Sequence, residues 1–237
     1  MSTFFISDIH FDHKNILHLC NRPFKDLDHM TETIIQNWQG IVTDNDTVFV
    51  VGDFAFQYQN VPKYLSRLPG NKILIAGNHD KCAKELWAHS PGKYVDFYLR
   101  AGFSAVLTHT MLTIANHQVM LSHFPYKGDP QERYHDKRLE DRGHYLIRGH
   151  QHNKAPFYNG ARQFNVSVEV TNYKPVSIEV MEDIITSGTT EIIPTTPAIN
   201  NENDFHSQFD DTSTISLQNV TSLNNPLQSG GREGEPD

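Results

Sequence analysis

Three short apolar runs near the N-terminus constrain the fold of this chain more than any other feature. They read TFFIS (residues 3–7), TVFVV (47–51) and KILIA (72–76). Their length and their content of β-branched and aromatic residues are typical of buried strands. Helix-like stretches separate them, and such alternation favours an α/β layer that contains parallel strands.

The two stretches between these runs have the pattern of helices. In residues 29–42, Met30, Ile34 and Trp38 recur every four residues, which predicts an amphipathic helix. Residues 61–70, VPKYLSRLPG, predict a shorter helix that ends at its Pro-Gly pair.

After residue 97 the pattern changes to strands. Residues 104–125 predict strands joined by a turn at Asn116-His117, and RQFNVSVEV (162–170) and PVSIEVM (175–181) predict further strands. This order of elements fits a sandwich of two mixed β-sheets flanked by helices.

A shift in composition divides the chain into two parts. Residues 1–183 are long enough to form a folded domain, and residues 184–237 form a tail. The tail is rich in Thr, Ser, Asn, Asp, Gly and Pro, and we expect it to be disordered or weakly docked. A short strand near TEIIPTT (190–196) is the alternative. The tail carries a net charge of −7 and the rest of the chain −1. A nearly neutral folded part argues against strong non-specific binding to duplex nucleic acid.

Several classes of protein are disfavoured by what the sequence lacks. No apolar run approaches the ~20 residues that a membrane span needs, and the start MSTFFISD has no signal-peptide pattern. The two cysteines, Cys20 and Cys82, are too few for a disulfide framework or a zinc knuckle. We therefore expect a soluble cytoplasmic protein with no membrane partner.

Polar side chains follow each of the strand-like runs. They are Asp8 and His10, then Asp53, then Asn78, His79 and Asp80, then His123 in LSHFP, and finally His150 and His152 in RGHQH. The carboxyl ends of parallel strands meet at one edge of a sheet, where sites assemble. Carboxylate and amide oxygens mixed with imidazole nitrogens suit divalent Mn, Fe, Zn or Co better than Ca or Mg. Two such ions ~3.5–4 Å apart would need a bridging carboxylate.

Each fragment also has a plainer interpretation. A single DxH, GNH or GHxH sequence marks a polar loop more often than a metal ligand, so the order of the fragments is what favours a metal site. Gly52, Gly77 and Gly149 are expected to let the backbone turn sharply beside these residues.

The order Asp8-x-His10, Gly52-Asp53, Gly77-Asn78-His79-Asp80, His123, Gly149-His150-x-His152 resembles the calcineurin-like metallophosphoesterase superfamily. FDHKNILHLCNRPF and NVSVEVTNYKPVSIEVM are similar to a group of small bacterial and phage phosphoesterases, so the resemblance covers roughly residues 3–183. It implies the metallophosphoesterase fold, a phosphoric ester hydrolase in a bacterial or phage-infected cell, and two divalent metal ions, with Mn favoured.

The resemblance also implies a role for each matching residue. One metal would be held by Asp8, His10, Asp53 and His152, and the other by Asp53, Asn78, His123 and His150, with Asp53 bridging. His79 would donate to the phosphate or act as general acid, with Asp80 orienting its ring. Hydroxide formed between the two cations would attack phosphorus in line while His79 protonates the leaving alkoxide. A structural histidine that caps a turn is the alternative for His79.

Two segments supply candidates for substrate binding. Residues 124–145 include Arg133, His135, Arg138 and Arg142, which could bind phosphate as part of a lid over the metals. Five acidic residues nearly balance the basic ones, so a solvated charged loop is the alternative. After the first strand, His13, Lys14, Asn15 and Arg22 could line the rim of the pocket, with His13 and Asn15 favoured, although Asn15 could instead cap the helix NILHLC.

Three functions remain open at this point. The compact domain and the aromatic residues of 124–145 favour a phosphodiesterase that acts on small nucleotides or cyclic nucleotides. A phosphomonoesterase or protein phosphatase would have an open, shallow groove. A non-catalytic binding module on the same fold would lack some of the ligands or His79, all of which this chain keeps.

Overall fold

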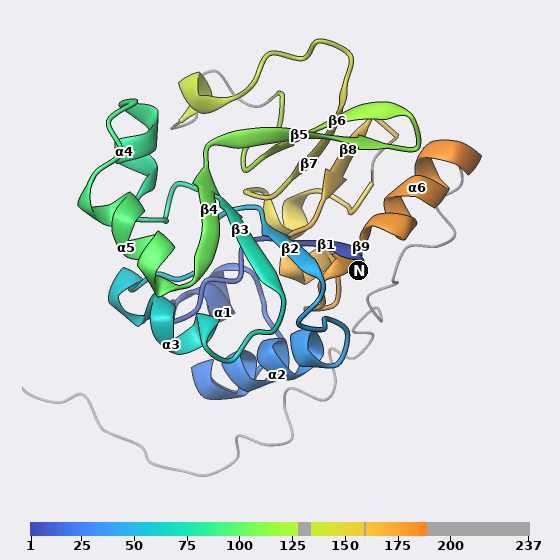
Figure 1. Cartoon of the computed structure of the whole chain (residues 1–237). Coiled ribbons are helices and arrows are strands. Elements are labelled where there is room, and N and C mark those ends of the chain that lie inside the picture. The colour runs from blue at the N-terminus through green and yellow to red at the C-terminus, as the bar shows by residue number, and fades with distance from the viewer. Residues whose placement is uncertain (128–133, 159, 189–237) are drawn as a thin grey trace, which may run out of the picture. The chain divides into compact units, whose positions relative to one another are not determined.

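The two-sheet architecture expected from the sequence is present in the computed structural model, which describes residues 1–127, 134–158 and 160–188 (Figure 1). Within these residues, the first sheet has five strands in the order β4-β3-β2-β1-β9. Strands β1 to β4 are parallel, and β9 is antiparallel to β1. The strands are β1 (Thr3–Ile6), β2 (Thr47–Val50), β3 (Asn71–Ile75), β4 (Phe103–Leu107) and β9 (Val176–Ser177). The three runs that open the sequence are therefore confirmed as neighbouring parallel strands.

The second sheet, within the same described residues, has four strands in the order β5-β6-β7-β8. They are β5 (His109–Ile114), β6 (His117–Ser122), β7 (Tyr145–Arg148) and β8 (Gln163–Asn165). β5 and β6 are antiparallel, whereas β6, β7 and β8 are parallel. Ala115 and Asn116, with φ of 47° and 63°, form the hairpin turn. Positive φ at both positions gives a turn whose twist fits a two-residue hairpin, one residue earlier than predicted.

Apart from α6 (Ile178–Ser187), which packs on the inter-sheet core, the helices cover the face of the first sheet that points away from the second (Figure 1). The helices are α1 (Ile16–Leu19), α2 (Leu27–Gln39), α3 (Val61–Leu65), α4 (Ala83–Trp87), α5 (Lys93–Ala101) and α6 (Ile178–Ser187). Short 3₁₀ turns are η1 (Tyr58–Asn60), η2 (His135–Lys137), η3 (His152–Lys154) and η4 (Val168–Val170). The predicted helix at 29–42 is confirmed as α2. It begins earlier because the Asp26 carboxylate accepts the N–H of His29 at 2.7 Å, and it ends at Gly40.

Alternation along the strands sorts the apolar side chains into two cores. Phe4 and Ile6 of β1 pack with the helices, whereas Phe5 between them packs between the two sheets. β2 repeats this pattern with Val48 and Val50 on one side and Phe49 on the other. The period of two residues thus lets the same strands contribute to both cores.

The strands predicted after residue 160 are mostly wrong. β8 ends at Asn165 and the turn η4 follows it, while β9 ends at Ser177 and α6 begins at the next residue. Ile178, Met181 and Ile184 pack on the inter-sheet core at helical spacing, so the period of PVSIEVM and its continuation is helical. α6 runs past the expected domain boundary at 183, and the expected tail from residue 189 lies outside the described residues.

Among the described residues, no helix has the length and apolar character that a membrane span requires.

Candidate metal centre

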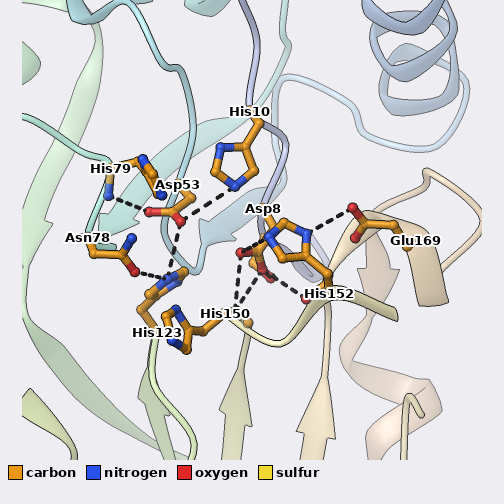
Figure 2. A network of polar contacts seen from close by, with 12 residues as sticks. Asp8, His10, Asp53, Asn78, His79, His123, His150, His152 and Glu169 are labelled. Atoms are coloured by element: carbon orange, nitrogen blue, oxygen red, sulfur yellow. Dashed lines mark hydrogen bonds and ion pairs between the residues drawn. The ribbon is translucent and has the colours of Figure 1, made fainter. Parts of the chain in front are cut away.

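The carboxyl ends of β1, β2, β3, β6 and β7 meet at one edge of the sandwich, and the seven expected ligands lie there (Figure 2). Around Asp8, the His10 and His152 rings stack with centroids 5.2 Å apart, and His152 Nε2 lies 3.7 Å from Asp8 Oδ1. These three residues each offer a ligand atom within 4.8 Å of the others. They form the first donor set.

The second donor set surrounds His123. Its Nε2 lies 3.2 Å from Asn78 Oδ1, and its ring centroid lies 5.2 Å from that of His150. Asp53 stands between the two sets, because its Oδ2 is 3.5 Å from His10 Nε2 and 3.4 Å from His123 Nε2. One carboxylate oxygen therefore faces both groups of donors.

The backbone of this edge is strained. Five of the seven expected ligands have left-handed φ, namely Asp8 (55°), His10 (54°), Asp53 (56°), His150 (70°) and His152 (49°). A left-handed conformation costs roughly 1–2 kcal/mol for a residue with a Cβ. Hydrogen bonds hold it in place, since Asp8 N–H donates to Gly52 O at 3.0 Å and His10 N–H to Asp53 O at 3.0 Å. Strain of this kind concentrates at functional sites.

The three glycines matter for different reasons. Gly52 has a φ of +92°, as expected for a sharp turn, whereas Gly77 and Gly149 do not lie in that region. There the constraint is space: a Cβ on Gly77 would lie 2.3 Å from Asp53 Oδ1, and one on Gly149 would lie 2.2 Å from Asp8 Oδ2. The expected sharp turn is therefore wrong for Gly77 and Gly149. Glycine is needed there because a carboxylate lies where a Cβ would be.

The electrostatics of the edge favour positive charge. Burial alone would raise the pKa of Asp53, but the charge and hydrogen bond of His123 outweigh it and hold that pKa below its usual range. Burial likewise opposes charge on His123 and His152, yet Asp53 raises the pKa of His123 to about 9 and Asp8 raises that of His152 to about 11. Two buried carboxylates thus draw cationic partners to themselves.

The residues present fit divalent metal ions. Both ring nitrogens of His10 are buried and lack a hydrogen-bond partner among the described residues, as expected of a ligand that awaits a metal. Burial lowers the pKa of His10 to about 3, which keeps its ring neutral and able to coordinate. The carboxylate, amide and imidazole donors match the preferences of divalent transition ions.

The role expected for Asp80 is wrong. Its buried carboxylate accepts the backbone N–H groups of Gly77 (2.8 Å), Asp53 (2.9 Å) and Phe54 (3.1 Å), and not the His79 ring. Burial and the charge of Asp53 raise the pKa of Asp80 to about 7, and the three N–H groups offset part of that rise. Asp80 therefore shapes the two loops that carry Asp53 and Asn78.

His79 lies beside the bridging carboxylate. Its backbone N–H donates to Asp53 Oδ1 at 2.8 Å, and its exposed ring is 5.1 Å from that of His10 (Figure 2). Because the hydrogen bond to Asp53 uses only the backbone of His79, its ring remains available to a group held at the metals.

Glu169 is a site residue that the sequence did not reveal, and it pairs with the buried Arg22. Glu169 Oε1 lies 2.9 Å from His152 Nδ1 and accepts Arg22 Nε at 2.9 Å and Nη2 at 2.7 Å. Arg22 was expected at the pocket rim, but it is buried and also donates to Ile9 O and Asp8 O. A single acid inside the apolar run NVSVEV was the signal for Glu169, since a buried charge needs a partner.

Of the rim candidates, His13 reaches the site and Asn15 does not contact it. The His13 ring centroid is 5.4 Å from that of His10. Asn15 is exposed at the start of α1, where its side chain makes no capping hydrogen bond.

The described part of 124–145 is largely paired within itself. Arg138 donates to the carbonyls of Pro125 and Lys127, Arg142 pairs with Glu140, and His135 is exposed in η2. None of these contacts involves a residue of the two donor sets. Arg133 lies outside the described residues.

Comparisons with known proteins place this geometry in a family. The calcineurin-like phosphoesterase profile matches residues 1–154. The chain is 33% identical over 193 residues to an uncharacterized protein of Methanocaldococcus jannaschii, covering 78% of this chain and 92% of that protein. It is 32% identical over 164 residues to the gene 66 protein of Mycobacterium phage L5, covering 64% and 77%.

Among solved structures, a protein of unknown function from Aquifex aeolicus superposes with a TM-score of 0.58 at 27% identity, covering 77% of this chain and 98% of that one. The motifs, the fold and these matches agree: the chain belongs to the calcineurin-like phosphoesterase family.

Proposed function

We propose that the protein is a phosphodiesterase with two divalent metal ions, Mn²⁺ favoured, that hydrolyses small nucleotide or cyclic-nucleotide phosphodiesters. The observation that carries the proposal is the position of Asp53. Its Oδ2 lies 3.5 Å from His10 Nε2 and 3.4 Å from His123 Nε2, between the two donor sets. A carboxylate shared in this way is what a two-ion site requires.

The first ion would be held by Asp8, His10 and His152 and the second by Asn78, His123 and His150, with Asp53 between them. Ions bound there would neutralise the phosphoryl oxygens and activate a water molecule as the nucleophile. The protein orients the ligands that it offers. The Val51 carbonyl, 2.9 Å from His123 Nδ1, fixes the proton on that nitrogen and leaves Nε2 free to coordinate.

His79 is the candidate general acid. Its backbone N–H donates to the Asp53 carboxylate, which holds the main chain of His79 beside the bridging group and leaves the ring exposed there. Protonation of the leaving oxygen from this ring would contribute typically 10²–10⁴-fold to the rate.

The charges near residues 124–145 favour a diester over a monoester. A phosphomonoester carries a second negative charge that a site must balance. Lys137 pairs with Asp136 at 2.7 Å and Arg142 with Glu140 at 2.9 Å, so these two cations are already neutralised. A singly charged diester needs no further cation beyond the metals.

Substrate choice tests the proposal. Mn²⁺-loaded protein is assayed with bis-p-nitrophenyl phosphate, p-nitrophenyl phosphate and 2′,3′-cyclic nucleotides. We expect turnover of the diesters to exceed that of the monoester. Faster hydrolysis of p-nitrophenyl phosphate would instead support a phosphomonoesterase, and two bound metals without turnover of any ester would support a binding module.

A further inference from the structure

Phe56 exposes a large apolar ring next to the candidate catalytic residue. Half of its surface, 51%, is exposed, although it lies only three residues after Asp53 in the chain. Its ring centroid is 4.4 Å from that of His13 and 6.1 Å from that of His79. Single apolar residues on a surface are common, but this ring lies against two histidines that border the metal centre.

The backbone under Phe56 is fixed. Its N–H donates to Phe11 O at 2.8 Å, and Phe11 and Ala55 form a parallel bridge between the two loops that carry Asp8 and Asp53. The Phe11 side chain is buried in the core below. The backbone that carries the exposed ring is therefore held in place beside His13, so no loop has to become ordered when a partner binds, which lowers the entropy cost of binding.

The rings of Phe56 and His13 are inclined to each other beside His79. Their ring planes meet at 51°, and Phe56 is inclined to the His79 ring by 37°. A flat group laid on Phe56 would have its ester oxygen close to His79, the group that protonates the leaving oxygen. With a phosphoryl group held at the metal centre, the two rings would lie on the side of His79, where the leaving oxygen would be protonated.

We propose that Phe56, with His13, is an aromatic platform that selects substrates whose leaving alcohol carries a planar aromatic ring, such as a nucleoside, which leaves through a sugar oxygen and carries a base, or a phenol. This inference rests on the proposed function, because it takes the metal centre as the site of the phosphoryl group. Stacking on a ring is tolerant of the identity of the base, so the platform selects for flatness rather than for one base.

Ligand binding tests the platform without relying on turnover. Dissociation constants of Mn²⁺-loaded protein are measured by calorimetry for phenylphosphonate, methylphosphonate and inorganic phosphate. We expect Phe56→Ala to weaken phenylphosphonate binding about tenfold, a loss typical of one stacked ring, and to leave the other two ligands within about twofold. Phe56→Trp should keep the preference for the phenyl group, and Phe56→Leu should lose most of it.

Met111→Ala is the matched control, because Met111 on β5 is also 51% exposed. An equal loss for all three ligands in Phe56→Ala would overturn the platform, as would wild-type protein that binds phosphate yet binds phenylphosphonate no tighter than methylphosphonate. Failure of the loaded wild-type protein to bind phosphate at all would overturn the proposed function, and the platform with it.

Discussion

The two ends of the five-stranded sheet shift the pKa of an aspartate in opposite directions. At the amino ends of the strands, the Asp46 carboxylate accepts the N–H of Ser2 at 2.7 Å and both the N–H and hydroxyl of Thr43, at 2.9 and 2.7 Å. The Ser2 and Thr43 donors lower the pKa of Asp46 to about 2. At the carboxyl ends, burial and the neighbouring Asp53 raise the pKa of Asp80 to about 7.

This difference separates stability from function within one sheet. At the amino end, the carboxylate of Asp46 accepts hydrogen bonds from Ser2 and Thr43. At the carboxyl end, Asp8, Asp53 and Asp80 lie close together, and Asp8 and Asp53 have left-handed backbone conformations. Strain and like charge persist in a native fold where the surrounding structure enforces them for binding or catalysis. Substitutions at the two ends should therefore affect different measurements.

The largest effect is expected for Asp53→Asn. Losing the shared charge should lower kcat/KM for bis-p-nitrophenyl phosphate by about 1,000-fold or more, since charge stabilisation by metal ions is worth several kcal/mol. Asp46→Asn, the same change at the other end, should leave kcat/KM within about twofold, because Asp46 contacts no expected ligand. Full activity in Asp53→Asn would contradict the two-ion site.

Gly149→Ala should disturb the carboxyl end of the sheet by a steric clash, without changing any charge. The new Cβ would lie 2.2 Å from Asp8 Oδ2 and 2.4 Å from Ser7 Oγ, so unfolding free energy should fall by roughly 1–3 kcal/mol. Bound Mn²⁺ is expected to raise the melting temperature of the wild type, and this increase should be lost in the variant because Asp8 must move.

Gly160→Ala is the control for a small added side chain. Gly160 has a φ of +74° and its Cβ would meet nothing within 4 Å, so this variant should lose some stability but keep the response to Mn²⁺. A full Mn²⁺ response in Gly149→Ala would show that Asp8 is not a ligand.

Glu169→Gln should weaken metal binding at one donor set and leave the other unchanged. Glu169 lies 2.9 Å from His152 Nδ1, whereas His123 is oriented by the Val51 carbonyl, which no side-chain change removes. Loss of a carboxylate behind a metal-bound histidine typically lowers metal affinity 10–100-fold. Calorimetric titration with Mn²⁺ should show one of two binding steps weakened about tenfold or more and the other unchanged.

Glu32→Gln removes a surface carboxylate paired with Arg67 and should leave both steps unchanged. Equal weakening of both Mn²⁺ steps in Glu169→Gln would mean that Glu169 supports the whole edge and not His152.

The sequence predicted features that depend on a local pattern, and it did not predict those that depend on contacts between distant segments. The placement of Asp8, Asp53 and Asn78 at one edge could be predicted because each comes shortly after a recognisable strand, and parallel neighbours bring such ends together. Asp80 was assigned to the wrong partner because its partners are backbone N–H groups of two loops, which no side-chain pattern encodes. Glu169 was missed because its place depends on a turn, η4, that has the composition of a strand.

Asp46 supplies the smallest expected effect, on stability alone. A carboxylate whose pKa is lowered on folding stabilises the fold above its unfolded pKa, and that contribution is lost as the pH falls through the folded pKa. With a folded pKa of about 2 against 3.8, the stability difference between wild type and Asp46→Asn should be constant above about pH 4 and shrink toward pH 2. Urea unfolding of the metal-free protein across this range measures it, with Asp44→Asn as the control for loss of one exposed charge on the same loop. A difference that grows on acidification would mean that Asp46 is not held as a carboxylate by Ser2 and Thr43, and the contrast between the two ends of the sheet would fail at the amino end.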